Sequence, residues 1–196
     1  MTQERIGDGI IRAAPEADAA AIAAIYRPYV TDTVTSFELD PPDAAEFVRR
    51  MTVIPRLPWL LAQVGERVAG YAYASPHRSR AAYRWSVDCS VYLAAGFQRA
   101  GWGRRLYSAL FAELRDLGYA TVFAGITLPN PASVGLHASL GFQPVGTYRN
   151  VGFKSGSWHD VSWWQLPLFT ELAAMPTDPR AWEPIFVDRN GPRPRH

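Results

Sequence analysis

The sequence predicts a single α/β domain in which a mixed sheet is flanked by helices. Three observations support this fold class. Between residues 68 and 73, even and odd positions form two distinct sets, Val-Gly-Ala and Ala-Tyr-Tyr, as on the two faces of a paired strand. Apolar residues recur every three or four positions in several other segments, as they do in amphipathic helices. After residue 83, strand-like and helix-like segments follow one another in turn, which is typical of α/β units.

The chain is expected to begin with a short strand at residues 10–12 and two helices. In "APEADAAAIAAIYRPYV", the apolar spacing from Ile22 to Tyr29 predicts the first helix, and Pro15 suits its first position. The segment "PPDAAEFVRRM" predicts the second helix, with Asp40 or Asp43 near its cap. Between the two, "TVTSFELD" favours an extended, β-like connection.

Strands dominate the middle of the chain. "WLLAQVGERVAGYAYAS" predicts two strands joined by a tight turn at Gly65 and Glu66. An arginine-rich loop at residues 76–82 follows. The next segment, "YRWSVDCSVYL", predicts a long strand whose apolar content favours burial on both faces.

The second half alternates helices and strands. Leucines from Trp102 to Leu117 predict a helix ended by a glycine. "ATVFAGI" predicts a buried strand, "NPASVGLHASL" a helix, and "VSWWQLPL" a last strand. The proline-rich tail, residues 170–196, predicts an extended or partly disordered extension of a domain that spans residues 1–169.

Composition excludes several classes of protein. Apolar residues make up 48% of the 196 residues and charged residues 19%, as in ordinary globular proteins. A net charge of +2 is too small for a nucleic-acid surface, so no nucleic-acid partner is expected. No apolar stretch is long enough for a membrane span or an export signal, so we expect a cytoplasmic protein without a membrane partner. We interpret the single cysteine, Cys89, as a core residue rather than a nucleophile.

A glycine pair between a strand and a helix suggests a phosphate-binding turn. Glycine permits a positive φ and close approach of a ligand, and free amides at a helix start attract an anion. An ordinary tight turn would use the same glycines, so the motif alone leaves both interpretations open. The segment consists of Gln98, Arg99, Ala100, Gly101, Trp102 and Gly103.

This segment resembles the acetyl-CoA pyrophosphate loop of the GCN5-related N-acetyltransferase (GNAT) superfamily. Further stretches, "SFE", "VAGYAYASPHRSRAAYRWSVDCSVYL", "LPNPASVGLHASLGF" and "GFKSGSWHDVSWWQLPL", resemble its phosphinothricin acetyltransferase branch from Ile10 to Leu168. The resemblance implies a GNAT fold, which is a mixed, mostly antiparallel sheet with splayed parallel strands. It also implies acetyl-CoA as co-substrate, no metal, and a homodimer, in which His159 and Trp158, Trp163 and Trp164 would shape the last strands and the dimer contact.

Asp88 and His137 are the candidate catalytic residues. Asp88 interrupts an apolar strand, where a carboxylate must be hydrogen-bonded, paired or functional. The family has glutamate here, so the shorter Asp88 is expected to remove the substrate's proton through a water; a structural carboxylate is the alternative. The resemblance places His137 near the thioester sulfur as an acid, and the alternative is a surface or core histidine.

The remaining candidates bind the two substrates. Asn130, Ser133 and His137 share one helix face, and the resemblance places Asn130 beside the pantetheine arm, although it also suits an N-cap. We expect four strand residues, Ser90, Val91, Tyr92 and Leu93, to bind the cofactor as well. Arginine side chains bind a carboxylate or phosphinate group well, so the arginines of the loop at residues 76–82 are candidates for binding the acceptor. With the residues that the resemblance adds, the predicted acceptor pocket consists of Phe37, Arg78, Arg80, Tyr83 and Tyr92.

The sequence thus predicts an enzyme that transfers an acetyl group from acetyl-CoA to the α-amine of a small amino acid such as L-phosphinothricin, by direct attack in a ternary complex. Two alternatives stay open. The acceptor could instead be methionine sulfone or sulfoximine, which share an oxygen-rich tetrahedral side chain. The chain could also be a CoA-binding module without turnover, although such a module would not need the carboxylate of Asp88.

Overall fold

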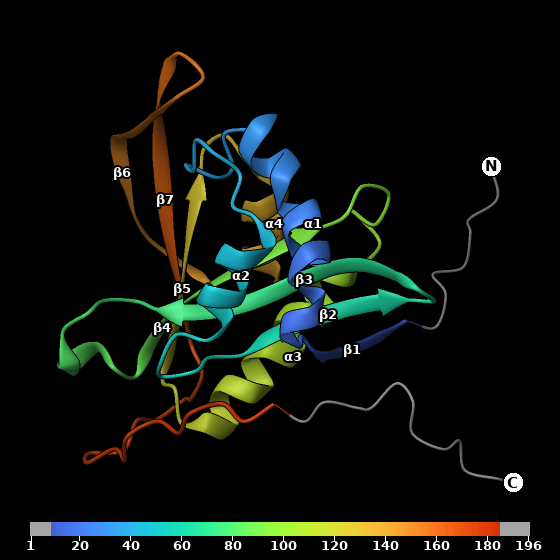
Figure 1. Cartoon of the computed structure of the whole chain (residues 1–196). Coiled ribbons are helices and arrows are strands. Elements are labelled where there is room, and N and C mark those ends of the chain that lie inside the picture. The colour runs from blue at the N-terminus through green and yellow to red at the C-terminus, as the bar shows by residue number, and fades with distance from the viewer. Residues whose placement is uncertain (1–8, 185–196) are drawn as a thin grey trace, which may run out of the picture.

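The computed structural model describes residues 9–184 (Figure 1). Along the chain, two short 3-10 turns, Glu16–Asp18 and Ala81–Tyr83, accompany the helices and strands. The helices are α1 (Ala19–Thr31), α2 (Ala44–Met51), α3 (Trp102–Leu117) and α4 (Pro131–Ser139). The strands are β1 (Ile10–Ala13), β2 (Trp59–Val64), β3 (Arg67–Pro76), β4 (Ser86–Leu93), β5 (Thr121–Thr127), β6 (Gln143–Lys154) and β7 (Ser157–Pro167).

The strands form one seven-stranded sheet in the order β1-β2-β3-β4-β5-β7-β6. All neighbouring strands in the described chain are antiparallel except β4 and β5. That parallel pair is joined only at its start, where Ser86–Asp88 align with Thr121–Phe123. Because both strands continue beyond these residues, their ends splay apart. The predicted mixed, mostly antiparallel sheet with splayed parallel strands is therefore confirmed.

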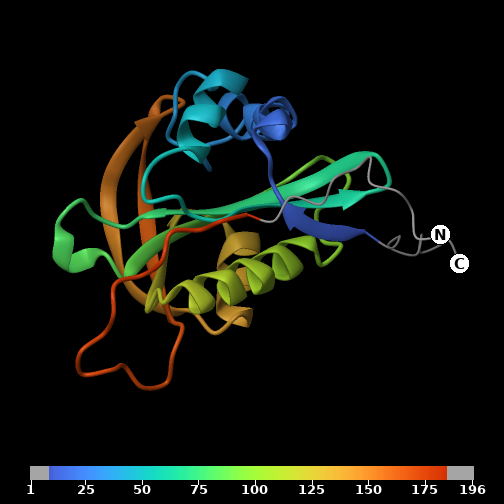
Figure 2. The same ribbon diagram turned by 60° about the horizontal axis from the view of Figure 1, so that its bottom comes forward.

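Helices cover both faces of the sheet. Figures 1 and 2 show α1 and α2 on one face, and α3 and α4 on the opposite face. Helices α1, α2 and α3 each bury apolar residues, such as Ile22 on α1 and Leu106 on α3, whereas the buried residue of α4 is His137. This three-layer arrangement leaves the splayed ends of β4 and β5 lying between helices on either side.

Most predicted elements form, with corrections near the N-terminus. Pro15 caps the 3-10 turn, and α1 begins four residues later, at Ala19. Asp43, rather than Asp40, caps α2 by accepting a hydrogen bond from the Glu46 amide at 2.9 Å. The expected β-like connection at residues 33–40 contains no strand, because no neighbouring strand lies beside it for backbone pairing.

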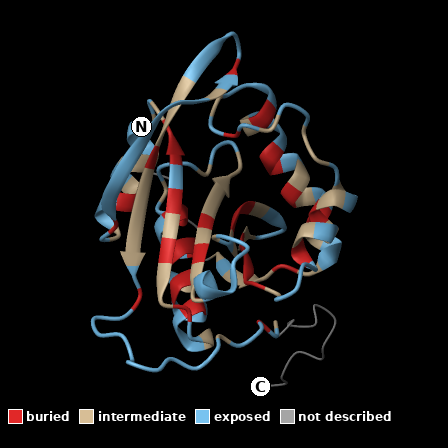
Figure 3. Ribbon diagram, turned by 90° about the vertical axis from the view of Figure 1, so that its left-hand side faces the viewer, coloured by how far each residue is buried: buried red, intermediate tan, exposed pale blue. Residues whose placement is uncertain are grey.

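Two strands differ from their sequence patterns. On β4, Val87 and Cys89 are buried, whereas Asp88 and Ser90 are only half-buried. The prediction that both faces of this strand are buried is therefore wrong. The long strand β6 is exposed over nearly all of its length (Figure 3). Because its residues do not alternate between a buried and an exposed face, periodicity does not reveal it.

The tail beyond β7 lies along the body of the domain as far as it is described, to residue 184. It contains no helix or strand there. Trp182 is buried against α3, and its Nε1 donates to Glu113 at 3.1 Å. Arg84 forms an ion pair with Asp178 at 2.8 Å. Residues 185–196 of the predicted extension lie outside the described part. No helix in the described chain is long and apolar enough to cross a membrane.

Candidate active site

A small cavity, the inner cavity, occupies the gap where β4 and β5 separate. Its volume is about 60 Å³. The end of β4 from Cys89 to Tyr92 forms one wall, and β5 residues 124–127 form another. The N-terminal half of α4 closes the gap. Within residues 9–184, no strand pairs with β4 on its β5 side beyond Asp88, so peptide groups on that side are available to a ligand as far as Leu93, which Tyr29 engages.

A larger, more open cavity, the outer cavity, lies on the face of the sheet covered by α1 and α2. Its volume is about 570 Å³. The loop at residues 35–38, the ends of β4 and β5, and strands β6 and β7 line it. The two cavities share Thr35, Tyr92, Gly125 and Thr127. A ligand in the inner cavity can therefore meet a second ligand in the outer one.

Asp88 is the last residue of β4 that pairs with β5, so it lies where the gap begins. Its side chain is 27% exposed, and its Oδ1 is 2.6 Å from Nδ1 of His77. Burial raises the pKa of Asp88, while the hydrogen bond from His77 and the charges of His77 and Arg78 oppose this rise. The carboxylate is thus partly desolvated at the mouth of the gap, as a proton acceptor requires. No local sequence pattern marks His77 as a site residue.

His137 lies on α4 with only 3% of its surface exposed, and it lines the inner cavity. Its Nδ1 is 2.8 Å from the carbonyl oxygen of Ser133, and a carbonyl can only accept, so Nδ1 carries a proton. Nε2 is buried without a hydrogen-bond partner in the described chain. Burial lowers the pKa of His137. The prevailing form is therefore neutral with a lone pair on Nε2.

The expected helix face is present beside His137. Asn130 and Ser133 line the same inner cavity. Asn130 also caps α4, because its Oδ1 accepts a hydrogen bond from the Ser133 amide at 3.0 Å. The N-cap role predicted for Asn130 is confirmed.

The predicted phosphate-binding segment is the entrance of α3. Arg99 and Gly101 have φ values of 60° and 80°, so the chain turns here in the left-handed region that glycine favours. A Cβ on Gly103 would lie 3.1 Å from Leu136, so this glycine allows α3 to pack closely on α4. Trp102 is only 1% exposed, so its side chain belongs to the core. The first-turn amides have no acceptor within the helix.

Other predicted cofactor residues take different positions in the structure. Ser90, Val91 and Tyr92 line the inner cavity, but Leu93 does not. The Leu93 backbone is engaged instead by Tyr29, whose hydroxyl donates to the Leu93 carbonyl at 2.8 Å. The side chains of Gln98, Arg99 and Ala100 precede α3 outside both cavities.

The predicted acceptor residues are brought together only in part. Phe37 and Tyr92 line the outer cavity. Arg78 lies over the ring of Trp163, another lining residue, with its guanidinium 5.7 Å from the ring centre. Arg80 and Tyr83 belong to the nearby 3-10 turn and do not line the cavity.

Phe37 lies against β6 because that strand carries a glycine. A Cβ on Gly152 would lie 2.2 Å from the Phe37 ring. Lys154, two residues further, is buried and donates from Nζ to the carbonyl oxygens of Val30 and Ser36, both at 2.7 Å. Burial lowers the pKa of Lys154. The strand thus holds the loop that carries Phe37.

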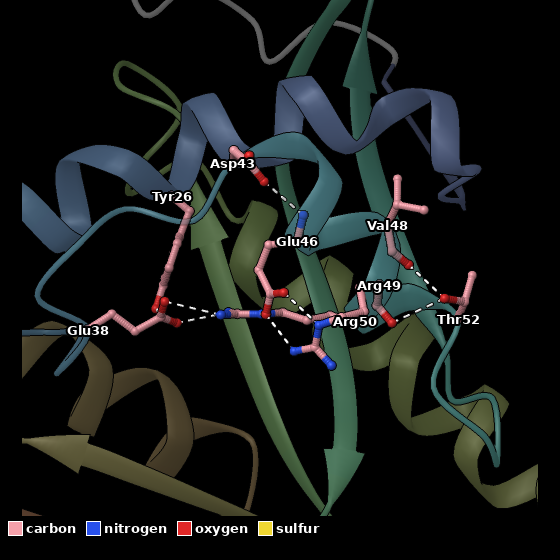
Figure 4. A network of polar contacts seen from close by, with 8 residues as sticks. All are labelled: Tyr26, Glu38, Asp43, Glu46, Val48, Arg49, Arg50 and Thr52. Atoms are coloured by element: carbon pink, nitrogen blue, oxygen red, sulfur yellow. Dashed lines mark hydrogen bonds and ion pairs between the residues drawn. The ribbon is translucent and has the colours of Figure 1, made fainter.

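A polar network that the sequence did not reveal includes two residues that line the outer cavity, Tyr26 and Glu38 (Figure 4). Glu38 accepts hydrogen bonds from Arg50 at 2.8 and 3.1 Å and from the hydroxyl of Tyr26 at 3.0 Å. Arg50 also contacts Glu46 at 2.8 Å. Three residues that line the outer cavity, Tyr26, Glu38 and Trp163, lie on α1, on the loop before α2 and on β7. No local sequence pattern therefore predicts that they meet at this cavity.

The alternation along β7 does place Trp163 and Trp164 on opposite faces of the sheet.

Cys89 lines the inner cavity but is not activated. Burial raises its pKa to about 12, so the thiol stays protonated at neutral pH. The described residues contain no cluster of three or more metal-ligating side chains.

Comparison with known proteins identifies the family. A family model described as an acetyltransferase (GNAT) domain matches residues 11–163. The phosphinothricin N-acetyltransferase of Streptomyces viridochromogenes is 39% identical over 176 residues, which cover 89% of this chain and 93% of that protein. A Salmonella typhimurium L-methionine sulfoximine/L-methionine sulfone acetyltransferase is 35% identical over 161 residues, which cover 81% and 94% of the two chains.

A solved structure gives the same result. The GNAT phosphinothricin acetyltransferase from Sinorhizobium meliloti, determined in complex with acetyl-CoA, superposes with a TM-score of 0.82 at 37% identity. The match covers 86% of this chain and 93% of that one. The arrangement of the sheet and its helices is thus a known fold. The chain belongs to the GNAT family and is an acetyl-CoA-dependent N-acetyltransferase.

Proposed function

We propose that the protein transfers an acetyl group from acetyl-CoA to the α-amine of a small amino acid, with L-phosphinothricin as the foremost acceptor. The adjoining inner and outer cavities carry this proposal, since they let a thioester and an amine meet at the end of β4. Relatives named for phosphinothricin acetylation support the acceptor class.

The pyrophosphate of acetyl-CoA would lie on the amides at the entrance of α3, residues 98–103, as an anion does at a helix N-terminus. The pantetheine arm would then run along the edge of β4 beside Ser90–Tyr92, short of Leu93, whose backbone Tyr29 engages, and past Asn130 and Ser133. Its peptide-like amides suit that edge because the edge offers free backbone donors and acceptors. The thioester would reach the inner cavity, near His137.

Asp88 would act as the base. It takes a proton from the substrate ammonium, directly or through a water, and the freed amine attacks the thioester carbonyl carbon. The nitrogen of the tetrahedral intermediate still carries a positive charge. As the intermediate collapses, the C–S bond breaks, CoA leaves as a thiolate, and the nitrogen releases its second proton to solvent, which leaves a neutral amide. The position of Asp88 at the mouth of the gap supports this role.

His137 would protonate the departing thiolate. Its Nδ1 proton is committed to Ser133, so the proton it gives must first be taken up on Nε2. The lowered pKa favours release of that proton once it is bound. His137 therefore serves as an acid only in its doubly protonated form.

The acceptor would occupy the outer cavity, with its apolar part against Phe37 and Tyr92. Arg78, and Arg80 and Tyr83 from the following turn, would bind its carboxylate or phosphinate group. For Arg80 and Tyr83 this requires movement of the turn, because neither lines the cavity in the structure.

A homodimer is part of this proposal. β6 is the edge strand of the sheet and exposes Val145, Tyr148, Val151 and Phe153, with Trp158 on β7. Exposed apolar side chains on an edge strand suit a second copy of the chain. Analytical ultracentrifugation of the wild type and of Trp158→Ser tests this pairing: a monomeric wild type contradicts it. The predicted cytoplasmic location stays a prediction.

The deciding experiment measures thiol release from acetyl-CoA with phosphinothricin, methionine sulfone, methionine sulfoximine, glutamate and a lysine peptide. We expect the fastest thiol release with phosphinothricin. Preference for a methionine derivative supports the alternative that the Salmonella relative suggests. CoA binding without release of thiol from any member of the panel supports a non-catalytic CoA-binding module.

A further inference from the structure

The contact between His77 and Asp88 is built into the fold. His77 follows β3 directly, and Asp88 pairs with Ser75 across the β3–β4 ladder. The distance of 2.6 Å between Nδ1 and Oδ1 is short, as in hydrogen bonds to ionised groups. The contact uses only one carboxylate oxygen: Oδ2 of Asp88 has no hydrogen bond to the described residues.

The imidazole is held by aromatic rings from three other elements. It stacks on Phe123 of β5, with ring centres 4.2 Å apart and planes at 16°. Tyr83 and Trp163 approach edge-on, with centres at 6.1 and 6.0 Å. The His77 side chain is only 11% exposed. A ring confined in this way restricts the orientation of the carboxylate that it contacts.

We propose that His77 is a positioning residue for the base, donating from Nδ1 so that Asp88 stays ionised and presents Oδ2 to the substrate ammonium or its bridging water. This inference rests on the proposed function of Asp88. It also accounts for how an aspartate, one methylene shorter than glutamate, is held in a fixed geometry at this position.

The charges around the pair support this role. Burial alone would favour the protonated carboxylic acid, which cannot accept a proton. Besides His77, the groups that act on Asp88 are Arg78, which follows His77, Tyr73 of β3 and Cys89 of β4. Burial raises the pKa values of Tyr73 and Cys89, so both are neutral at working pH. Tyr83 is the further titratable side chain that faces His77.

Two variants separate the hydrogen bond from the packing of the ring. His77→Phe keeps an aromatic ring against Phe123 but removes the donor. His77→Asn loses the ring but keeps an N–H donor at the position of Nδ1. We expect His77→Phe to lower kcat about tenfold or more and to move the acidic limb of the kcat/KM profile upward by about one pH unit. His77→Asn should keep the acidic limb within a few tenths of a unit of the wild type.

The dissociation constant for acetyl-CoA, measured by calorimetry, should be the same in both variants and the wild type. A His77→Phe profile that superimposes on the wild-type profile overturns the proposal. Equal displacement by both variants also overturns it, because the ring and not the donor would then matter. If His77→Phe does not fold, His77→Asn and the following measurement decide.

Proton NMR tests the hydrogen bond without any turnover. A downfield Nδ1–H resonance should be present in the wild type and absent from Asp88→Ala, and its absence from the wild type would overturn the proposal. If the wild type acetylates no acceptor but shows this resonance, the proposed function fails while the contact stands. The two failures are therefore distinguishable.

Discussion

The Nδ1 atom of His137 donates a hydrogen bond to the carbonyl oxygen of Ser133, one turn earlier in α4, at 2.8 Å. This contact fixes the tautomer of a histidine that is almost completely buried. A second proton on this ring would add a charge in a poorly solvated place. The same residue therefore links the site to the pH dependence of folding.

The stability of the protein should fall as the pH drops below about 6.5. The pKa of His137 is lowered from 6.5 in the folded chain, so the unfolded chain binds this proton first. The contribution of neutral His137 is complete above that pH and is lost below it. Thermal unfolding from pH 8 to 5 should show a shallower fall for His137→Gln than for the wild type. Unfolding temperatures that fall equally with pH in the two proteins would contradict this expectation.

Asp88→Asn should lower kcat by about 10²- to 10⁴-fold, the usual range for loss of a general base. The affinity for acetyl-CoA should stay nearly unchanged, because only proton removal is lost. Steady-state kinetics and calorimetric titration measure the two quantities. An equal loss of CoA binding would make Asp88 a structural residue.

Arg78→Ala and Arg80→Ala should each raise KM for the acceptor about tenfold, since each would remove a charge-assisted contact. KM for acetyl-CoA should not change. Arg27→Ala is a matched control, because Arg27 is an exposed arginine on α1 whose side chain makes no hydrogen bond to the described residues. If Arg80→Ala behaves like this control, Arg80 does not belong to the acceptor site.

Lys154→Met should destabilise the fold by about 1–3 kcal/mol, because two buried carbonyl oxygens lose their donor. It should also raise KM for the acceptor, since the Ser36 carbonyl adjoins Phe37. Chemical denaturation and kinetics report the two effects. Arg149→Ala, at a side chain 79% exposed, should produce neither.

Trp182→Ala should lower stability by about 3–5 kcal/mol, the usual cost of truncating a buried tryptophan. Because Trp182 lies on α3 away from both cavities, kcat at 25 °C should stay near the wild-type value. Denaturant unfolding with an activity assay checks both. An unchanged unfolding midpoint would mean that the arm does not stabilise the domain.

The sequence predicts the regular elements well where periodicity is strong. The helix at Trp102–Leu117 and the turn at Gly65 and Glu66 form as expected, because apolar spacing and glycine act locally. The connection at residues 33–40 has β-branched residues but no partner strand, so its propensity is not realised. Strand β6 pairs only along one edge and is exposed, which removes the alternation that would reveal it.

The site is predictable only where its residues share one element. Asn130, Ser133 and His137 follow helical spacing, and the structure places all three beside the inner cavity. The contact between His77 and Asp88 depends on the register of two strands, which no local pattern specifies. Long-range convergence of this kind is visible only in the folded chain.

Lys154 is the only lysine in the sequence, and the structure buries its amine between two carbonyl oxygens. All other side chains that stay positively charged at neutral pH are arginines. The guanidinium group of arginine is not a nucleophile at neutral pH. An enzyme that holds a reactive thioester thus offers it no lysine amine on its own surface. The chain is protected by composition from acetylating its own lysine side chains.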